Sequence, residues 1–389
     1  MPRRREDRKT ERQEDRPPGE IVTVALTDMA QTGEAIGRVD GVVLFVPFGM
    51  PGDRAEVLVT ERKRTFARGQ LLRLVEPAPD RVTPSCPYFT ICGGCEWQHM
   101  PYAEQLRLKE TNVRTHLTRI GKVRDPHVCP CLPSPQPYGY RNHARLQWSA
   151  TGALGYRAAR SHEVVAVEQC PILEPALNAE LHRLTLTDQP AASAEIELRV
   201  AMPLRIGEYT YHIAPEAFFQ ANTPVAAQLV TTVLQALALQ GHEQVLELYC
   251  GGGLFTVPMA AAARYVLGIE GNAAALADAH LNVVAAGVSE RCTFINAAVE
   301  QAITDPTLEA RTWDAIVLDP PRAGVAQPVL ATLLNFAAPT IVYVSCDPAT
   351  LARDAQIICA AGYQLVYAQP LDMFPQTHHV ETVALFARA

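Results

Sequence analysis

The sequence has no run of 18 or more apolar residues, so it predicts no helix long enough to span a membrane. Its first five residues lead into alternating charges instead of an apolar segment, and we therefore expect no signal peptide. Ten cysteines among 389 residues are too few for a disulfide scaffold. These absences predict a cytoplasmic protein, in which clustered cysteines would bind a metal or act in catalysis.

Charge is divided unevenly along the chain. Residues 1–160 carry 25 Lys and Arg against 18 Asp and Glu, whereas residues 161–389 carry 9 against 23. The overall net charge of −7 hides this basic front half, which predicts a polyanionic partner whose phosphates it would contact. A solvated surface without any partner would show the same charge, so charge alone does not distinguish it from a surface that binds a polyanion.

The front of the chain divides into two parts. Residues 1–16 alternate Arg, Glu and Asp with almost nothing apolar, which predicts a disordered arm. Residues 17–76 then contain short apolar or alternating runs between turn residues, as in a small all-β barrel. The basic stretch at residues 61–68 includes Phe66, so it could contact phosphates and stack on a base. We expect strands at residues 21–26, 42–46, 54–60 and 69–74.

Two phrases in this barrel resemble a known domain. The turn Gly-Glu-Ala-Ile-Gly-Arg at residues 33–38 and the phrase Val-Pro-Phe-Gly-Met-Pro-Gly-Asp at residues 46–53 are similar to those of a TRAM domain, a small RNA-binding barrel. The resemblance covers about residues 19–76 and implies that this part of the chain binds RNA.

Three cysteines lie within ten residues, after a proline-rich connector at residues 77–84. Gly93 and Gly94 would let the backbone curl so that the thiolates converge on one centre, as zinc or an iron-sulfur cluster requires. The spacing leaves both kinds of centre open. The three residues are Cys86, Cys92 and Cys95.

A complete site needs a fourth ligand, for which the sequence offers two choices. One is the pair Cys129 and Cys131. The other is Cys170, which is followed by a proline as Cys86 is.

Residues 77–215 predict a central α+β domain around this site. An amphipathic helix is expected at residues 101–120, although it could pack on the following domain instead. Strands are expected at residues 141–148, 154–157, 164–167, 196–201 and 209–213. The polar side of the helix would carry Arg107, Lys109, Arg114 and Arg119.

Strands and helices alternate from residue 216 to residue 389, which predicts an α/β fold with a doubly wound, Rossmann-like sheet. Helices are expected at residues 224–239, 254–262 and 273–286. Strands are expected at residues 244–249, 265–270, 292–295, 313–318, 340–345, 364–369 and 382–387.

A glycine turn follows the first of these strands, at residues 249–255. It lacks the separated third glycine of a dinucleotide fingerprint, and no Lys-Ser or Lys-Thr follows for a nucleoside triphosphate. Glu270, at the end of the next strand, could accept hydrogen bonds from both ribose hydroxyls of an adenosyl cofactor. Together these features favour S-adenosylmethionine over NAD.

Two further strands end in residues suited to chemistry. Residues 341–348 place the thiol of Cys346 at a strand end, where ligands bind in an open α/β sheet; a buried thiol that only packs is the ordinary alternative. Asp319 begins Asp-Pro-Pro-Arg, a loop that its prolines stiffen. Arg322 stands where amino methyltransferases keep an aromatic residue, which argues against methylation of an exocyclic amine.

The whole set resembles the RNA uracil-5 methyltransferases over about residues 19–389. The motifs are Cys-x5-Cys-Gly-Gly-Cys after a TRAM-like barrel, a distant Cys-Pro, Leu-Asp-Pro-Pro-Arg and Ser-Cys-Asp-Pro. The resemblance implies that Cys346 is the nucleophile and Glu381 the base. It also implies an S-adenosylmethionine site formed by Gln220, Tyr249, Gly251, Leu254, Glu270 and Asp319, and a 4Fe-4S cluster bound by Cys86, Cys92, Cys95 and Cys170. Leu254 departs from the family, since some members have Asn at that position.

Uracil chemistry explains why a thiol and a base are needed. Carbon 5 is a poor nucleophile until a thiolate adds to carbon 6, and a base must afterwards remove the carbon 5 proton. We expect 23S ribosomal RNA as the substrate, because the transfer-RNA members of the family typically lack the barrel and the cluster. Transfer RNA is the alternative, and we expect neither a membrane nor an obligate protein partner.

Two other functions compete with this interpretation. One is a non-catalytic RNA-binding assembly factor, which the intact Cys346, Glu381 and Asp319 argue against. The other is cytosine-5 methylation, in which the nucleophile belongs to a Pro-Cys loop. No proline precedes a cysteine in residues 216–389.

Overall fold

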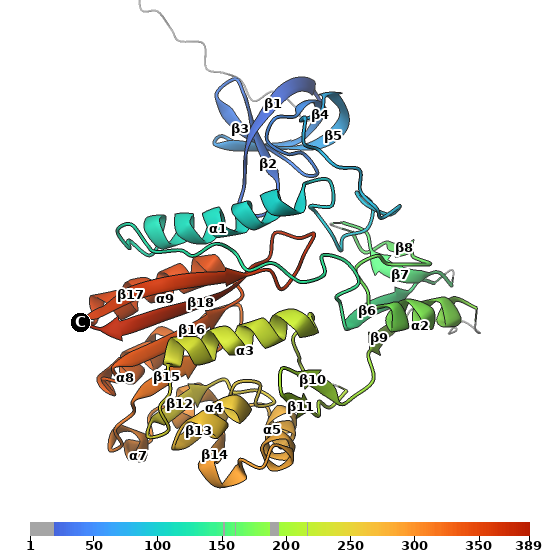
Figure 1. Cartoon of the computed structure of the whole chain (residues 1–389). Helices are drawn as coiled ribbons and strands as arrows, with labels where there is room; N and C mark the ends of the chain where they lie inside the picture. The colour runs from blue at the N-terminus through green and yellow to red at the C-terminus, as the bar shows by residue number, and fades with distance from the viewer. Residues whose placement is uncertain (1–18, 151, 160, 187–193, 216) are drawn as a thin grey trace, which may run out of the picture. The chain divides into compact units, whose positions relative to one another are not determined.

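The computed structural model describes residues 19–150, 152–159, 161–186, 194–215 and 217–389 (Figure 1). The chain divides into two compact units, Met1–Thr83 and Pro84–Ala389. The disordered arm predicted at residues 1–16 lies outside the described residues. Among the described residues, no helix combines the length and the apolar character that crossing a membrane would require.

The first unit is a closed barrel of five strands in the order β1-β2-β3-β5-β4. Small and branched side chains such as Leu26, Leu44 and Val57 fill its interior. The predicted turn at residues 33–38 is wrong in part, because β2 begins within it. Gly37 lies where β2 passes close to β1. A Cβ at this position would lie 2.5 Å from Cγ2 of Val24, so β2 can approach β1 this closely only because Gly37 has no side chain. The strands are β1 (Ile21–Met29), β2 (Ala35–Val39), β3 (Val42–Val46), β4 (Arg54–Arg62) and β5 (Phe66–Glu76).

The second unit is built on a seven-stranded sheet in the order β14-β13-β12-β15-β16-β18-β17. The first five strands in this order run parallel, and β18 pairs antiparallel with both β16 and β17. This confirms the predicted doubly wound sheet. The strands are β12 (Gln244–Leu248), β13 (Tyr265–Glu270), β14 (Cys292–Asn296), β15 (Ala315–Leu318), β16 (Thr340–Ser345), β17 (Tyr363–Leu371) and β18 (Glu381–Arg388).

Alternate residues of the central strands pack on opposite faces of this sheet. Ile341 and Tyr343 of β16 join one core, whereas Val342 and Val344 join the other. Both faces are therefore covered, which is why these strands have continuous apolar sequences. The helices on the first face are α1 (Tyr102–Arg119), α8 (Gln327–Asn335) and α9 (Pro348–Ala360). Those on the second face are α3 (Thr223–Leu237) and α4 (Thr256–Ala262). The helix α5 (Ala273–Ala285) follows β13, and three short helices lie in the connections: η1 (Ser289–Arg291), α6 (Val299–Ala302) and α7 (Pro306–Glu309).

The helix α1 packs against α9 and β17 of this sheet (Figure 1). Its Val113 and Leu117 are fully buried in the same core as Leu351 and Ala355 of α9. The helix thus packs on the seven-stranded sheet, which is the alternative that the sequence left open. The prediction that Lys109 lies on the polar side of α1 is wrong, because its side chain is fully buried.

A second, four-stranded sheet in the order β8-β7-β6-β9 lies within the same unit, together with a two-stranded hairpin. Leu146, Trp148 and Leu154 pack against Leu177 and Leu181 of a helix that we did not predict. The boundary that we expect between residues 215 and 216 stays a prediction. The elements are β6 (His143–Trp148), β7 (Leu154–Arg157), β8 (Val164–Ala166), α2 (Pro175–Thr185), β9 (Glu195–Arg199), β10 (Leu204–Ile206) and β11 (Tyr209–Tyr211).

Candidate active site

The order of the strands reverses between β12 and β15, and in open α/β sheets ligands bind beyond the carboxyl ends of the strands at such a point. The predicted glycine loop lies there. Tyr249, Gly251 and Gly253 all have positive φ angles, of 63°, 52° and 83°. Two of these positions need the freedom of glycine, and the turn that they make leaves the Gly251 N–H directed at the neighbouring strand.

That N–H donates to Oε2 of Glu270 at 3.0 Å, and the N–H of Asn272 donates to Oε1 at 2.7 Å. Each carboxylate oxygen can accept a second hydrogen bond. The structure therefore brings together Gly251 and Glu270, and it leaves acceptor capacity on Glu270 for the hydroxyls of a ribose.

Two other predicted cofactor residues, Tyr249 and Leu254, belong to this loop, and Gln220 lies in the segment before α3. The Leu254 carbonyl accepts a hydrogen bond from the Tyr211 hydroxyl at 2.9 Å. Gln220 is buried, and its carbonyl accepts from Nδ2 of Asn142 at 2.9 Å. Burial raises the pKa of the Tyr249 hydroxyl to about 12, so it remains a hydrogen-bond donor at neutral pH.

Sequence reasoning missed a buried carboxyl group beneath the loop. Glu247, in the middle of β12, is 1% exposed, and only one of its carboxyl oxygens has a partner, the Thr256 hydroxyl. Burial raises its pKa to about 8. A single Glu within an apolar strand is the signal that could have identified it, since such a position seldom carries a charge.

Asp319 lies at the end of β15, where its N–H donates to the Leu248 carbonyl at 3.4 Å. The residue keeps part of its surface exposed, and burial of the carboxyl group itself raises its pKa to about 7. Its charge also acts on Cys346, which follows β16, and on Glu381, which begins β18.

The ends of β16 and β18 bring the predicted nucleophile and base together. The last antiparallel pair of these strands is Ser345 with Thr382, and the next residues in that register are Cys346 and Glu381. Cys346 is partly exposed, whereas Glu381 is only 3% exposed.

Burial, with the charge of Glu381 as the second cause, raises the pKa of the Cys346 thiol to about 11. Burial also raises the pKa of Glu381 well above its usual range, with the charge of Asp319 as the second cause. The exposed Arg322 lowers both pKa values. Sequence reasoning used Arg322 only as a missing aromatic residue, but here its charge lies within electrostatic reach of the thiol and the carboxyl group.

The other thiol that follows a strand, Cys250, is buried against Leu276 and Ala279. Its contacts are those of a small apolar side chain.

The predicted metal ligands line one cavity in the second unit. Its walls include the thiols of Cys86, Cys92, Cys95 and Cys170, together with side chains such as Tyr88, Tyr156 and Ile172. All four thiols are free. Cys170 is therefore the fourth thiol here, while Cys129 and Cys131 are not among the lining residues.

Backbone contacts fix the two segments that carry these cysteines. The Gly93 N–H donates to the Arg157 carbonyl at 3.1 Å, and a Cβ on Gly93 would lie 3.2 Å from the same oxygen. Cys170 and Asn178 exchange two hydrogen bonds, at 2.8 and 2.9 Å. Burial raises the pKa of Cys92 to about 11 and that of Cys95 to about 12. In the part of the chain that the structure describes, no three His, Cys, Asp or Glu side chains converge as a site for a single metal ion.

The predicted basic stretch of the barrel is partly occupied by internal pairs. The Arg68 guanidinium contacts Glu34 at 2.8 Å and lies over the rings of Phe45 and Phe66, at 5.6 and 6.0 Å from their centroids. Lys63 and Arg64 are exposed. Lys63 contacts Glu61 at 3.2 Å. This surface thus combines exposed cations with aromatic rings, as RNA-binding surfaces do.

Comparisons with known proteins agree with this geometry. The model of the tRNA (Uracil-5-)-methyltransferase family matches residues 196–389, and that of the TRAM domain matches residues 15–72. The 23S rRNA (uracil(1939)-C(5))-methyltransferase RlmD of Edwardsiella ictaluri is 35% identical and covers 95% of this chain and 96% of its own length. A protein of Thermosynechococcus vestitus, named an uncharacterized RNA methyltransferase, is 34% identical over 94% of this chain and 98% of its own.

One solved structure is similar along almost the whole chain. It is the Pyrococcus abyssi tRNA (uracil-54, C5)-methyltransferase in complex with S-adenosyl-L-homocysteine, with a TM-score of 0.74 at 24% identity. It covers 94% of this chain and 100% of its own. At this level of identity the similarity shows the fold.

Proposed function

We propose that this chain methylates a uridine of 23S ribosomal RNA through a covalent adduct with Cys346. The premise is that the chain belongs to the family of S-adenosylmethionine-dependent RNA uracil-5 methyltransferases. The observation that carries the proposal is the register of β16 and β18, which sets Cys346 next to Glu381. Asp319 and Arg322 lie within electrostatic reach of both.

The raised pKa values suggest an order of proton transfers. In the free protein the raised pKa values favour the protonated forms of the Cys346 thiol and of the Glu381 carboxyl group. A neutral Glu381 does not repel the thiolate, so Cys346 can ionise beside Arg322 and add to carbon 6 of the uracil. The sulfur then carries no charge, since its electron pair forms the new bond and the negative charge moves onto the ring.

The second half of the reaction requires a base. Carbon 5 takes the methyl group that S-adenosylmethionine supplies when it is bound. Glu381 can now ionise without a thiolate beside it, and its carboxylate takes the carbon 5 proton. The electrons of that C–H bond restore the double bond between carbons 5 and 6, and the thiolate of Cys346 leaves. One proton is released for each methyl group transferred.

The residues at the crevice fit an adenosyl cofactor. Glu270 has free acceptor capacity at the tip of β13, and the glycine loop at residues 251–253 allows close approach of the backbone. Gln220, Tyr249, Leu254 and Asp319 complete the proposed site.

Four cysteines line one cavity, and the resemblance to the family implies an iron-sulfur cluster there. Burial raises the pKa of the Cys92 and Cys95 thiols, so the positive charge of a bound metal centre would favour their thiolate forms. We propose that Cys86, Cys92, Cys95 and Cys170 bind a 4Fe-4S cluster, which would cross-link the two segments that carry them.

The choice of RNA follows the named relatives, which act on 23S ribosomal RNA. Transfer RNA is the second candidate, because the solved structure of similar fold is of a transfer-RNA enzyme. Purified protein with labelled S-adenosylmethionine should form 5-methyluridine in 23S ribosomal RNA from cells that lack the gene. Labelling of transfer RNA alone would reverse the choice, and 5-methylcytidine or no labelled nucleoside would contradict the reaction.

A further inference from the structure

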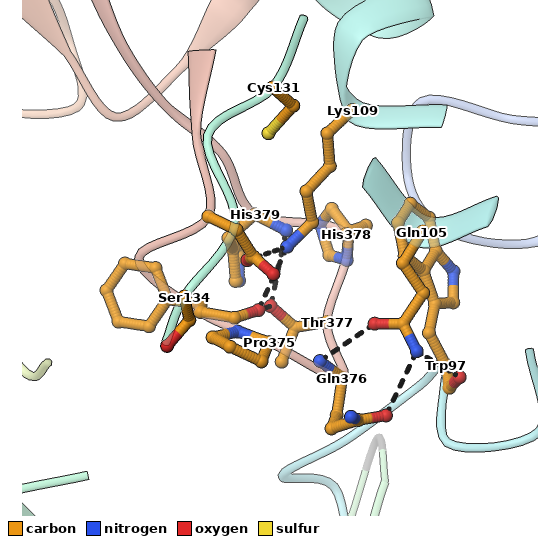
Figure 2. Close-up of polar contacts among 12 residues, drawn as sticks. Trp97, Gln105, Lys109, Cys131, Ser134, Pro375, Gln376, Thr377, His378 and His379 are labelled. Carbon is orange, nitrogen blue, oxygen red and sulfur yellow. Dashed lines mark hydrogen bonds and ion pairs between the residues drawn. The ribbon is translucent and has the colours of Figure 1, made fainter. Parts of the chain in front are cut away.

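The segment between β17 and β18 ends at the proposed base. It runs from residue 372 to residue 380, and Glu381 follows it as the first residue of β18. Glu381 is paired with Leu371 across the base of this segment, so the segment determines the direction from which the chain enters Glu381. Its contacts therefore matter for the chemistry, and several of them are drawn in Figure 2.

An ion pair buried from solvent holds the start of the segment. Lys109 of α1 pairs with Asp372, and the side chains of both residues are 0% exposed. The same ammonium group donates to the Phe374 carbonyl at 3.0 Å and lies 5.9 Å from the centroid of the Trp97 ring (Figure 2). Asp372 also donates its N–H to the Leu132 carbonyl at 2.9 Å.

A reciprocal pair of amides holds the middle of the segment. Oε1 of Gln105 accepts the Gln376 N–H at 3.0 Å, and Nε2 of Gln105 donates to Oε1 of Gln376 at 3.0 Å (Figure 2). Gln376 has a φ angle of 70°, which costs a residue with a side chain about 1–2 kcal/mol. The surrounding hydrogen bonds keep it in this conformation.

A third set of contacts connects this segment with the cysteine cavity. The Gln376 carbonyl accepts hydrogen bonds from the N–H groups of Glu96 and Trp97, at 3.1 and 3.0 Å. These two residues directly follow Cys95, which lines the cavity. The Tyr140 hydroxyl donates to the Pro375 carbonyl at 3.0 Å.

Stability alone does not explain so many buried polar contacts. Removing two charges from water is costly, and an apolar pair of similar volume often stabilises a protein as well as a buried ion pair does. What charged and amide groups add is a requirement for one geometry, because any other leaves them unpaired.

We propose that Lys109 and Gln105 of α1 are positioning residues, which hold the segment 372–380 in the one arrangement that presents the Glu381 carboxyl group to the uracil adduct on Cys346. The inference rests on the proposed function. It assigns to α1 a part in the step that releases the product, not in RNA binding or in formation of the adduct.

The test follows the covalent complex between protein and RNA. Lys109→Met combined with Asp372→Asn removes both charges at nearly constant volume, so that no unpaired ion is left in the core. Gln105→Met removes the amide pair without touching the ion pair. Arg119→Met removes one exposed charge from the same helix and serves as the control.

Both test variants should bind 23S ribosomal RNA with a Kd within about threefold of the native value and form the complex on denaturing gels at a near-native rate. They should then accumulate it, with release slowed about 100-fold, as expected when a catalytic group is displaced by about 1 Å. Native protein and Arg119→Met should show little complex at steady state. Release at the native rate, or a fall in adduct formation equal to the fall in turnover, would overturn the proposal.

RNA that contains 5-fluorouridine separates this result from a failure of the proposed function. Fluorine at carbon 5 cannot leave as a proton does, so the native protein should be trapped as the complex. If native protein traps 5-fluorouridine RNA and the variants do not accumulate a complex with ordinary RNA, the positioning role alone fails. If native protein traps none, the covalent mechanism fails, and the positioning role with it.

Discussion

Cys346 and Glu381 occupy opposite positions on two antiparallel neighbours, one residue beyond the last hydrogen-bonded pair of β16 and β18. Backbone pairing thereby sets the separation of the two main chains, and the segment 372–380 leads directly into the Glu381 side of the pair. Burial, Asp319 and Arg322 influence the protonation of the thiol and of the carboxyl group.

Replacing the nucleophile should stop turnover without preventing binding. We expect Cys346→Ala to lose at least about 10⁴-fold in kcat, because no other group can activate carbon 5. RNA binding, measured by filter retention, should change less than about threefold. Cys359→Ala, a change at a partly exposed thiol on α9, is the control and should keep native activity. Methylation by Cys346→Ala would remove the basis of the assignment.

Replacing the base should stop the reaction after the adduct has formed. Glu381→Gln keeps the shape of the side chain but cannot take the carbon 5 proton, so kcat should fall about 10²- to 10⁴-fold. The methylated RNA should remain covalently attached and run with the protein on a denaturing gel. Glu309→Gln, at an exposed carboxyl group, should show neither effect. Free 5-methyluridine RNA produced at the native rate by Glu381→Gln would mean that another group is the base.

The pH dependence should report the ionisation of Cys346. The pKa of its thiol is raised to about 11, so the fraction of thiolate grows about tenfold for each pH unit below that value. We therefore expect log kcat/KM to rise with a slope near +1 between about pH 6 and pH 9.

Arg322→Met removes the cation that lowers this pKa, and so kcat/KM at pH 7 should fall about two- to tenfold, less at high salt. Arg264→Met, an exposed charge at the amino end of β13, should leave the pH profile unchanged. A pH-independent kcat/KM over this range would show that the thiol does not ionise in the rate-determining step.

The proposed cluster can be tested by metal content. Protein purified without oxygen should contain about four iron atoms and equivalent acid-labile sulfide per chain. Cys170→Ser should lose most of both, whereas Cys129→Ser should keep them, because only Cys170 lines the cavity. Zinc in place of iron, or an equal loss in the two variants, would contradict the assignment.

How far the sequence determines the fold can be judged from particular strands. We predicted β13 and β16 with the observed bounds because each is a continuous apolar run that ends at a polar residue or a turn. We missed β2 because glycine is a poor strand former. Glycine occupies position 37 because β2 passes close to β1 there.

Side chains whose partners are distant in sequence were harder to predict. Lys109 was assigned to the polar side of α1 because nothing near it indicates burial, and its partner Asp372 lies 263 residues later. The proximity of Cys346 and Glu381 was equally hard to predict, since it depends on the reversed direction of β18. Before the structure, only the family resemblance suggested that the two residues act together.

The position of β18 between β16 and β17 has a consequence for motion. A strand paired on both sides exchanges its amide protons only when a large part of the sheet opens. Cys346 and Glu381 should therefore keep their alignment through the small fluctuations that displace edge strands and surface loops. The flexibility needed to admit a uridine would then have to come from the RNA, whose base leaves its stack, while the catalytic pair stays rigid.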